Sequence, residues 1–406
     1  MTKTRQVLVV EDSPTFQSYV SSLLEDAGFE PVIFSTLAET KVYLEKEPTF
    51  LCAVLDFCLP DAPRGEVIDY VLTHDHRVVV LTSNDDPNMR KTLFDKGIVD
   101  FILKDSAVSV AFLAPLLNRL VQNTNKKALV VEDSASMRAR LVDLLERQYL
   151  TVLSAENGLE ALEVCDHVDD INLIITDNDM PFMNGIELVQ HLRLENSRDK
   201  LSIIGLSASS NPELTSHFLK AGANDYLNKP FCQEELYCRI HTLLDIQDAS
   251  EQLFYLANRD ELTGLWNRRY FFNFAAENPS PNKMLAMIDV DHFKKINDSV
   301  GHEGGDHVLK ELGNLLKLSF SSALPARLGG EEFVVICTGN ETVFEQELIA
   351  FKTSVEHFQT EFDGNSITFT VSIGVSRGDR SLSLLLKEAD DKLYQAKRNG
   401  RNALVI

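Results

Sequence analysis

Residues that handle phosphate chemistry occur twice, in the same order, within the first 247 residues. Each set has an acidic pair after a short apolar run, then a lone aspartate, a hydroxyl and a lysine. The sets are Glu11, Asp12, Asp56, Thr82 and Lys104, then Glu132, Asp133, Asp177, Ser207 and Lys229. Clustered carboxylates repel one another unless a hard cation such as Mg2+ lies among them, and one can then attack phosphorus. A lysine and a hydroxyl would hold the phosphoryl oxygens, so the pattern predicts two phosphoryl-transfer sites.

A different acidic pattern appears after residue 260. Two acids end the apolar run MLAMIDVD and two follow a Gly-Gly pair; they are Asp289, Asp291, Glu331 and Glu332. Acids from a strand end and a turn can converge on two hard cations, which suits in-line displacement at phosphorus. Four cations could neutralise triphosphate charge: Lys294, Arg327, Lys397 and Arg401. The Gly-Gly pair alone would equally fit a simple hairpin turn.

The two phosphoryl-transfer patterns belong to an internal repeat. Asp12 and Asp133 are 121 residues apart, as are Asp56 and Asp177. The offset is 125 for Lys104 and Lys229, so copy one has four residues fewer between its lone aspartate and its hydroxyl. A period this long indicates tandem domains and not a solenoid.

The elements that must position these residues alternate along each copy. In copy two, ALVV, INLIIT, LSIIGLS and DYLN read as strands, and MRARLVDLLERQ, GLEALEVC, GIELVQHLR and PELTSHFLKAG read as amphipathic helices. Such alternation predicts an α/β fold with a doubly wound parallel sheet. Ligand sites in such sheets lie beyond the carboxyl ends of the strands, where the repeated residues fall.

On these residues, both copies resemble the receiver domains of bacterial response regulators, which have five strands. The resemblance implies that Asp56 and Asp177 accept phosphate from a cognate histidine kinase or phosphotransfer protein. It implies metal ligands in both sets of acids, and it identifies the switch residues as Thr82, Phe101 and Lys104, then Ser207, Tyr226 and Lys229.

The copies differ in two places. Lys229 is followed by Pro230, as is usual in the family, whereas Lys104 is followed by Asp105. The missing residues of copy one fall between Gly65 and Thr82, so we expect its third helix to be shortened or remodelled.

Residues 260–406 resemble the GGDEF family of diguanylate cyclases along their whole length. The signature reads Gly329-Gly330-Glu331-Glu332-Phe333, and the stretches DELTGLWNRR, DVDHFKKIND and AKRNGRN also match the family. The resemblance implies an α+β palm-like domain that joins two GTP molecules into cyclic di-GMP and releases two pyrophosphates. Because one such domain binds one GTP, catalysis would need a homodimer, which receiver phosphorylation would favour.

The resemblance also assigns roles within this domain. Mg2+ would be bound by Asp289, Glu331 and the carbonyl of Val290. Glu331 would take the proton of the attacking hydroxyl, with Glu332 and Lys294 as further catalytic groups. The remaining GTP contacts would be Asn297, His302 and Asp306 to guanine, and Lys294, Lys397 and Arg401 to phosphate; Arg327 is included as a GTP contact on its charge. The family's inhibitory R-x-x-D motif is replaced by Phe320-Ser-Ser-Ala323, so we expect no product inhibition there.

We therefore predict receiver domains over residues 1–122 and 126–247, a helical linker over 248–259, and the cyclase domain over 260–406. The linker pattern favours one continuous helix over a solvated hinge. An alternative function is a catalytically inactive GTP-binding scaffold controlled by receiver phosphorylation.

Composition narrows the class of protein. The net charge of -22 disfavours a nucleic-acid partner. The six cysteines form no C-x-x-C pair and are expected to be buried, reduced thiols. No apolar run is long enough for a membrane span or a signal peptide, so we expect a cytoplasmic protein.

Overall fold

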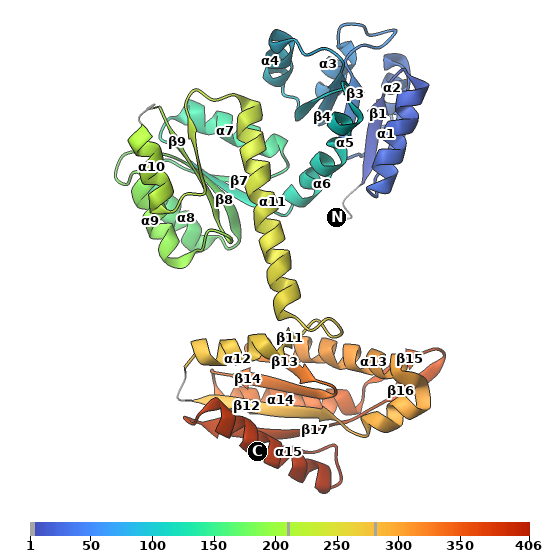
Figure 1. The fold of residues 1–406 in the computed structure, drawn as a ribbon, viewed down its shortest axis with the longest axis vertical. Helices are drawn as coiled ribbons and strands as arrows, with labels where there is room; N and C mark the ends of the chain where they lie inside the picture. Colours follow the sequence, from blue (N-terminus) through green and yellow to red (C-terminus); the bar gives the residue numbers. More distant parts are fainter. Residues whose placement is uncertain (1–4, 209–211, 280–281) are drawn as a thin grey trace. The chain divides into compact units, whose positions relative to one another are not determined.

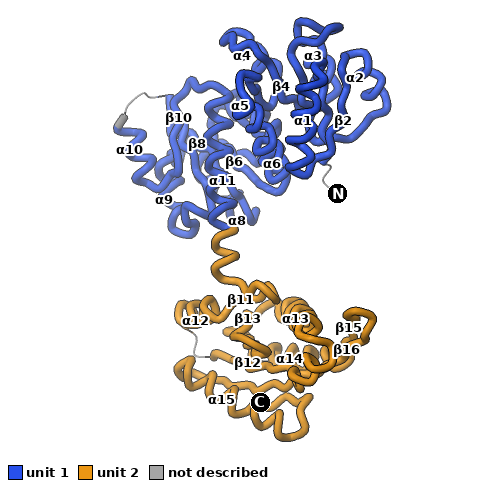
Figure 2. Tube along the Cα trace, turned by 45° about the vertical axis from the view of Figure 1, so that its right-hand side comes forward, with its two compact units in different colours: residues 1–251 blue, residues 252–406 orange. Residues whose placement is uncertain are grey.

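The computed structural model describes residues 5–208, 212–279 and 282–406. The chain divides into two compact units, residues 1–251 and 252–406, which are coloured separately in Figure 2. The first unit holds both copies of the repeat, and the second holds the acidic signature.

Within the described residues, copy one is a five-stranded parallel sheet with strand order β2-β1-β3-β4-β5. Its strands are β1 (Gln6–Val10), β2 (Glu30–Phe34), β3 (Cys52–Asp56), β4 (Val78–Thr82) and β5 (Asp100–Leu103). Its helices are α1 (Pro14–Asp26), α2 (Leu37–Leu44), α3 (Glu66–Leu72), α4 (Pro87–Lys96), α5 (Ala107–Ala111) and α6 (Leu113–Asn123). Buried apolar side chains cover both faces of this sheet, as expected for a doubly wound fold.

Copy two has the same topology, written from its other edge as β10-β9-β8-β6-β7. Its strands are β6 (Lys127–Val131), β7 (Thr151–Ala155), β8 (Ile171–Asp177), β9 (Ser202–Ser207) and β10 (Asp225–Asn228). Its helices are α7 (Ala135–Arg147), α8 (Gly158–His167), α9 (Gly185–Glu195) and α10 (Pro212–Ala221), followed by α11 (Gln233–Asn258). The predicted parallel sheets are confirmed (Figure 1). The half-exposed strand β7 had no clear signal in the sequence.

Two finer expectations are also confirmed. The third helix of copy one, α3, has 7 residues, whereas its counterpart α9 has 11, which accounts for the four missing residues. The segment after copy two is one continuous helix, α11, of 26 residues. Among the described residues, no helix is both long enough and apolar enough to cross a membrane.

The second unit is built on a mixed sheet with strand order β11-β13-β14-β12-β17-β18 within the described residues. These strands are β11 (Trp266–Asn267), β12 (Lys283–Val290), β13 (Leu324–Gly329), β14 (Glu332–Cys337), β17 (Val371–Gly378) and β18 (Leu404–Val405); β15 (Gln359–Phe362) and β16 (Asn365–Thr368) form a separate hairpin. The helices are α12 (Arg268–Glu277), α13 (Phe293–Ser319), α14 (Glu341–Glu356) and α15 (Leu382–Arg398). Buried apolar clusters lie on both faces of the sheet.

The C-terminal helix α15 begins at Leu382 and ends at Arg398. It ends there because Gly400, Arg401 and Asn402 all have positive φ angles. Residues 368–376 are divided between the end of β16 and β17. The prediction of buried thiols needs correction: the six cysteines are free, but only Cys52 and Cys337 are buried, whereas Cys165 is half-buried and Cys58, Cys232 and Cys238 are exposed.

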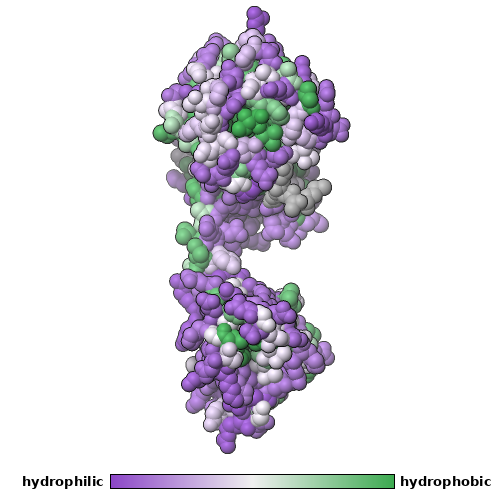
Figure 3. Space-filling view, turned by 90° about the vertical axis from the view of Figure 1, so that its right-hand side faces the viewer, coloured by the Kyte–Doolittle hydropathy of each residue, from purple (hydrophilic) through white to green (hydrophobic). Residues whose placement is uncertain are grey.

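The surface agrees with the acidic composition. On the face shown in Figure 3, hydrophilic residues predominate and hydrophobic residues gather only in small patches. Exposed apolar side chains include four in the second half of α11: Ile246, Leu253, Phe254 and Leu256.

Candidate functional sites

The acids of copy one meet at the carboxyl edge of its sheet. Glu11 and Asp12 follow β1, Asp56 ends β3, and Lys104 follows β5. Because these strands are parallel, their carboxyl ends lie at one edge. Oxygens of the three acids lie within 4.8 Å of one another. Lys104 Nζ lies 2.5 Å from Glu11 and 2.8 Å from Asp56. The three acids and the lysine of the sequence pattern therefore lie together in the fold.

Copy two repeats this geometry. Oxygens of Glu132, Asp133 and Asp177 also lie within 4.8 Å of one another. Lys229 Nζ lies 2.6 Å from Glu132 and 2.8 Å from Asp177. Burial raises the pKa of Glu132, as it raises that of Glu11 in copy one. Two buried carboxylates and one exposed carboxylate form an all-oxygen donor set, which fits a hard divalent cation.

The hydroxyl and aromatic switch residues lie on the strands next to these clusters. The hydroxyl residues Thr82 and Ser207 end β4 and β9 and are buried. The aromatic residues Phe101 and Tyr226 are 5% and 6% exposed. Tyr226 packs against Phe218 of α10, with ring centroids 5.6 Å apart. Phe101 has a different neighbour, because the guanidinium of Arg90 lies 5.1 Å from its ring centroid.

In the second unit, antiparallel pairing brings the acidic signature to the end of β12. Asp289 is the direct partner of Glu332 in the β12–β14 ladder. Burial raises the pKa of Glu331, and the nearby carboxylate of Asp289 raises it further. Lys397 Nζ from α15 lies 2.8 Å from Asp289. Three acids and one lysine from three elements therefore share one site.

Asp289 and Glu331 are suitable ligands for a hard cation. Burial raises the pKa of Asp289 even though Lys397 opposes the rise. Two carboxylates that are both hard to ionise favour a cation between them. Val290, the last residue of β12, places its carbonyl next to Asp289 in the chain.

Asp291 does not join this group, although the sequence pattern placed it among the acids. It is 4% exposed. Its carboxylate accepts hydrogen bonds from Thr370 Oγ1 at 2.8 Å, Ser372 Oγ at 2.6 Å and the backbone N–H of Asn402 at 2.8 Å. Asp291 therefore holds the C-terminal segment against β17, which is a structural role.

The hydrogen bonds of Arg327 could not be predicted from its residue type. It donates two hydrogen bonds to the carbonyl of Gly330, at 3.0 and 2.7 Å, and one to Asp260 Oδ1 at 3.0 Å. Burial opposes ionisation of Asp260, but hydrogen bonds from Arg327 and Thr263 hold its pKa below the ordinary value. Gly329 and Gly330 have φ angles of 150° and 53°, which other residues rarely adopt. Arg327 and Asp260 thus support a turn that needs both glycines.

The three residues assigned to guanine lie on α13, around a kink at Gly301 (φ 77°, ψ 171°). Gly305 packs so closely on Asn297 that an added Cβ would lie 1.8 Å from Asn297 Oδ1. The amide of Asn297 therefore lies beside the residue that precedes Asp306. His302, Asp306, Lys294 and Arg401 are exposed, and a ligand could reach them.

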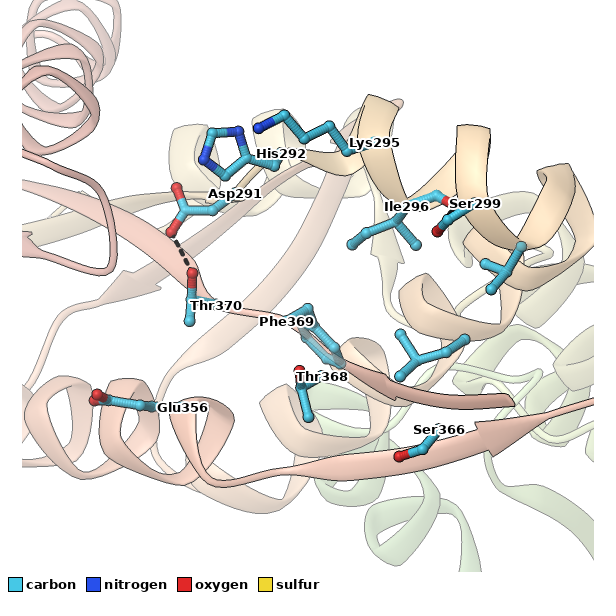
Figure 4. A pocket seen from close by; sticks show the side chains of 12 residues that line it. Asp291, His292, Lys295, Ile296, Ser299, Glu356, Ser366, Thr368, Phe369 and Thr370 are labelled. Atoms are coloured by element: carbon cyan, nitrogen blue, oxygen red, sulfur yellow. Dashed lines mark hydrogen bonds between the residues drawn. The ribbon is translucent and has the colours of Figure 1, made fainter. Parts of the chain in front are cut away.

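A hollow of about 450 Å³ lies between the start of α13 and β16 (Figure 4). His292, just before α13, and Lys295 of α13 line it, and Glu356, Ser366 and Thr368 line it from the opposite side. Asp289, Glu331 and Glu332 do not line it; Asp291 does, but its carboxylate already accepts three hydrogen bonds. The hollow is therefore separate from the acidic signature.

Comparisons with known protein families match the two copies of the repeat and the C-terminal segment separately. Residues 7–111 and 128–241 match the family "Response regulator receiver domain", and residues 257–403 match "Diguanylate cyclase, GGDEF domain". The two receiver matches together cover more than half of the chain.

Individual relatives match long stretches of the chain. The response regulator PleD of Caulobacter vibrioides is 31% identical over 301 residues, which cover 69% of this chain and 65% of PleD. Diguanylate cyclase A of Treponema denticola is 35% identical over 41% of this chain and 49% of its own length. The chain thus spans less than two thirds of either relative. A solved two-component response regulator/GGDEF protein is 36% identical, with a TM-score of 0.55, and covers 60% of this chain and 99% of its own.

Proposed function

Because the chain belongs to the response regulators of the diguanylate cyclase (GGDEF) family with two tandem receiver domains, we propose that it converts two GTP molecules into cyclic di-GMP and two pyrophosphates. In each half-reaction the 3'-hydroxyl oxygen of one GTP bonds to the α-phosphorus of the other. The bond from that phosphorus to the bridging oxygen breaks, and pyrophosphate leaves. The domain boundaries and the cytoplasmic location given above remain predictions.

The observation that supports this proposal best is the meeting of Asp289, Glu331, Glu332 and Lys397 at the end of β12. Glu331, whose pKa is raised, is suited to take the proton of the attacking hydroxyl at neutral pH. Asp289, Glu331 and the Val290 carbonyl would hold Mg2+, which supplies positive charge to the reacting phosphate when bound. Lys397 neutralises Asp289 and is positioned to shift towards a phosphate oxygen.

Base recognition is assigned to Asn297 and Asp306, with His302 beside them. A site that hydrogen-bonds one base edge rejects another base because its polar groups are then left unpaired. Lys294 and Arg401, which are exposed, are proposed phosphate contacts. Arg327 was assigned to phosphate on its charge, and its contacts favour a role in positioning the turn instead.

Control is assigned to the receiver copies. A histidine kinase or phosphotransfer protein would phosphorylate Asp56 and Asp177, each with Mg2+ in the adjacent acidic cluster. Phosphorylation would then favour a homodimer that brings two GTP-loaded domains together. An ion-paired lysine at each cluster, Lys104 and Lys229, is ready to bind the phosphoryl group.

A turnover assay tests the whole proposal. Purified protein is incubated with GTP and Mg2+, with and without beryllofluoride as a phosphoryl mimic, and the products are separated by chromatography. We expect cyclic di-GMP that increases with the mimic and falls at least about 100-fold in Glu331→Gln. Binding of GTP with no product under any condition would favour the inactive scaffold.

Product inhibition is not expected at the place where the family carries R-x-x-D. Phe320 is 3% exposed and packs against Phe344 and Phe351, with ring centroids 5.9 and 5.4 Å apart. A core phenylalanine offers no charge to a cyclic dinucleotide. Calorimetric titration of the full chain with cyclic di-GMP should show no tight binding in the absence of GTP, and a submicromolar affinity would contradict this prediction.

A further inference from the structure

The two receiver copies pack against each other with different surfaces. Copy one contributes α4, α6 and the residues just before β4 and β5, and copy two contributes the end of α7 and the helix α11. Gln148 Nε2 donates to the carbonyl of Val99 at 3.2 Å, and Arg77 Nη2 donates to the carbonyl of Glu146 at 3.2 Å. Copy two therefore contacts copy one beside β5, the strand that carries the switch aromatic Phe101.

Arg90 of α4 connects three features of this contact. Its guanidinium lies over the ring of Phe101, the switch aromatic of copy one, a favourable cation–π geometry. The same guanidinium lies 2.5 Å from Glu234 Oε1. Glu234 is the second residue of α11, the helix that continues to Asn258. The Arg90 side chain thus contacts both Phe101, the switch aromatic of copy one, and Glu234 in the first turn of α11.

Copy two does not repeat this arrangement, which indicates that it is specific to the contact. The position equivalent to Arg90, 125 residues later, is Thr215. Asp225 beside Tyr226 is held by Arg239 of α11 at 2.9 and 2.7 Å. The equivalent Asp100 in copy one has Ala114 at the position of that arginine. Asp100 instead interacts electrostatically with Arg90 of its own copy and Glu234 of the other.

The Arg90–Glu234 pair is weak enough to change during signalling. Both side chains are about a third exposed, at 34% and 32%, and exposed ion pairs contribute little to stability. A second cross-copy pair is different, because the Arg119 side chain is 3% exposed and contacts both Asp245 and Asp248 of α11. Leaving a buried guanidinium without a partner is costly, so Arg119 would keep α11 attached while the contact at Arg90 opens or closes.

We propose that Arg90 couples the phosphorylation state of copy one to α11: its pair with Glu234 forms while Phe101 holds the buried position described here and is lost when phosphorylation of Asp56 moves Phe101. The inference rests on the proposed receiver function of copy one and not on cyclase activity. Coupling between two sites is reciprocal. Removal of the Arg90–Glu234 pair must therefore change the affinity of Asp56 for a phosphoryl group.

The test measures beryllofluoride binding to the full-length chain by 19F NMR. Asp177→Asn is present throughout, so that binding reports on Asp56. Arg90→Ala, Glu234→Gln and the double variant form a cycle. We expect each single variant to bind beryllofluoride roughly threefold to fivefold more tightly, and the double variant to add nothing further. The matched control is Lys96→Gln, which breaks the pair with Asp69 on the same helix but within copy one, and it should change nothing.

Two results would overturn the inference. One is an unchanged affinity in both single variants, or strictly additive changes. The other is an Asp177→Asn protein whose copy one binds no beryllofluoride, because there is then no signal to transmit. Circular dichroism of every variant checks that the fold is intact, and hydrogen exchange at the first turn of α11 supplies a second readout, which should increase with beryllofluoride only when Arg90 is present. Loss of cyclase activity with this coupling retained would count against the proposed reaction alone.

Discussion

Arg327 shows how a single side chain can have a different role from the one its charge suggests. A cation beside a triphosphate site is a reasonable phosphate ligand, yet this guanidinium is already bound by Asp260 and the Gly330 carbonyl. Substituting it should disturb the position of Glu331 and not the affinity for GTP. Effects on kcat and KM separate these two roles.

We predict that Arg327→Ala lowers kcat about tenfold and leaves KM for GTP within about twofold. Asp260→Asn should reproduce the pattern, because Asp260 contacts Arg327 and Thr263. Arg327→Lys should recover part of the rate. Steady-state kinetics of the three variants distinguish the two roles. An increase in KM with unchanged kcat would show that Arg327 is a phosphate ligand.

Asp100 provides a prediction about pH. Its pKa is raised to about 7, mainly by burial and also by the nearby Glu234, while the hydrogen bond from the Phe101 N–H and the charge of Arg90 oppose the rise. Cys238 of α11 is the other titratable group that interacts with it. Because the pKa is higher in the folded state, the associated stability is full below about pH 4, the unfolded pKa, and is lost as pH rises through 7.

We therefore expect Asp100→Asn to be more stable than the wild-type protein at pH 8, by about 1 kcal/mol, and to show little advantage at pH 5. The amide can still accept the hydrogen bond from the Phe101 N–H. Thermal unfolding at the two pH values measures the difference. Asp225→Asn is the control, because Arg239 already neutralises Asp225; it should lose stability at pH 8.

Helix α13 shows how an element carries specificity. Its kink at Gly301 and the close contact at Gly305 place Asn297 beside Asp306. A methyl group at Gly305 would clash only with the end of the Asn297 side chain, because no atom of another residue would lie within 3 Å of it. That side chain can move, so the cost to folding should be small and the cost to base recognition large.

We predict that Gly305→Ala folds and retains the chain's thermal unfolding temperature within a few degrees, but reduces the preference for GTP over ATP about tenfold or more. Competition binding with the two nucleotides measures this preference. Gly339→Ala serves as a control, because an added Cβ there would come no closer than 3.7 Å to its nearest neighbour. Unchanged selectivity in Gly305→Ala would show that Asn297 does not recognise guanine.

The whole molecule combines sites whose activities depend on association. Each cyclase domain offers one acidic signature, so the proposed reaction needs two copies of the chain. We expect specific activity to increase with protein concentration, and beryllofluoride to move the midpoint of that increase about tenfold lower, which corresponds to about 1.4 kcal/mol of dimer stabilisation. Sedimentation in parallel should show the same shift, and activity independent of concentration would contradict the dimer requirement.

The repeat, the parallel sheets and the placement of Asp56, Asp177 and their lysines could all be predicted from the amino-acid sequence. This was possible because hydrophobic periodicity identifies the strands, and parallel strands deliver their carboxyl ends to one edge. The sequence also placed Glu331 and Glu332 on a hairpin, since the Gly-Gly pair is a local signal.

The surroundings of those residues could not be predicted and are known from the three-dimensional fold. Arg327 and Asp260 are 67 residues apart in the chain, and Arg90 and Glu234 are 144 apart. No local pattern records such contacts, because they depend on which surfaces pack together after the elements have formed. For the same reason Asp291, which looked like a metal ligand in the sequence, is a buried acceptor for Thr370, Ser372 and Asn402.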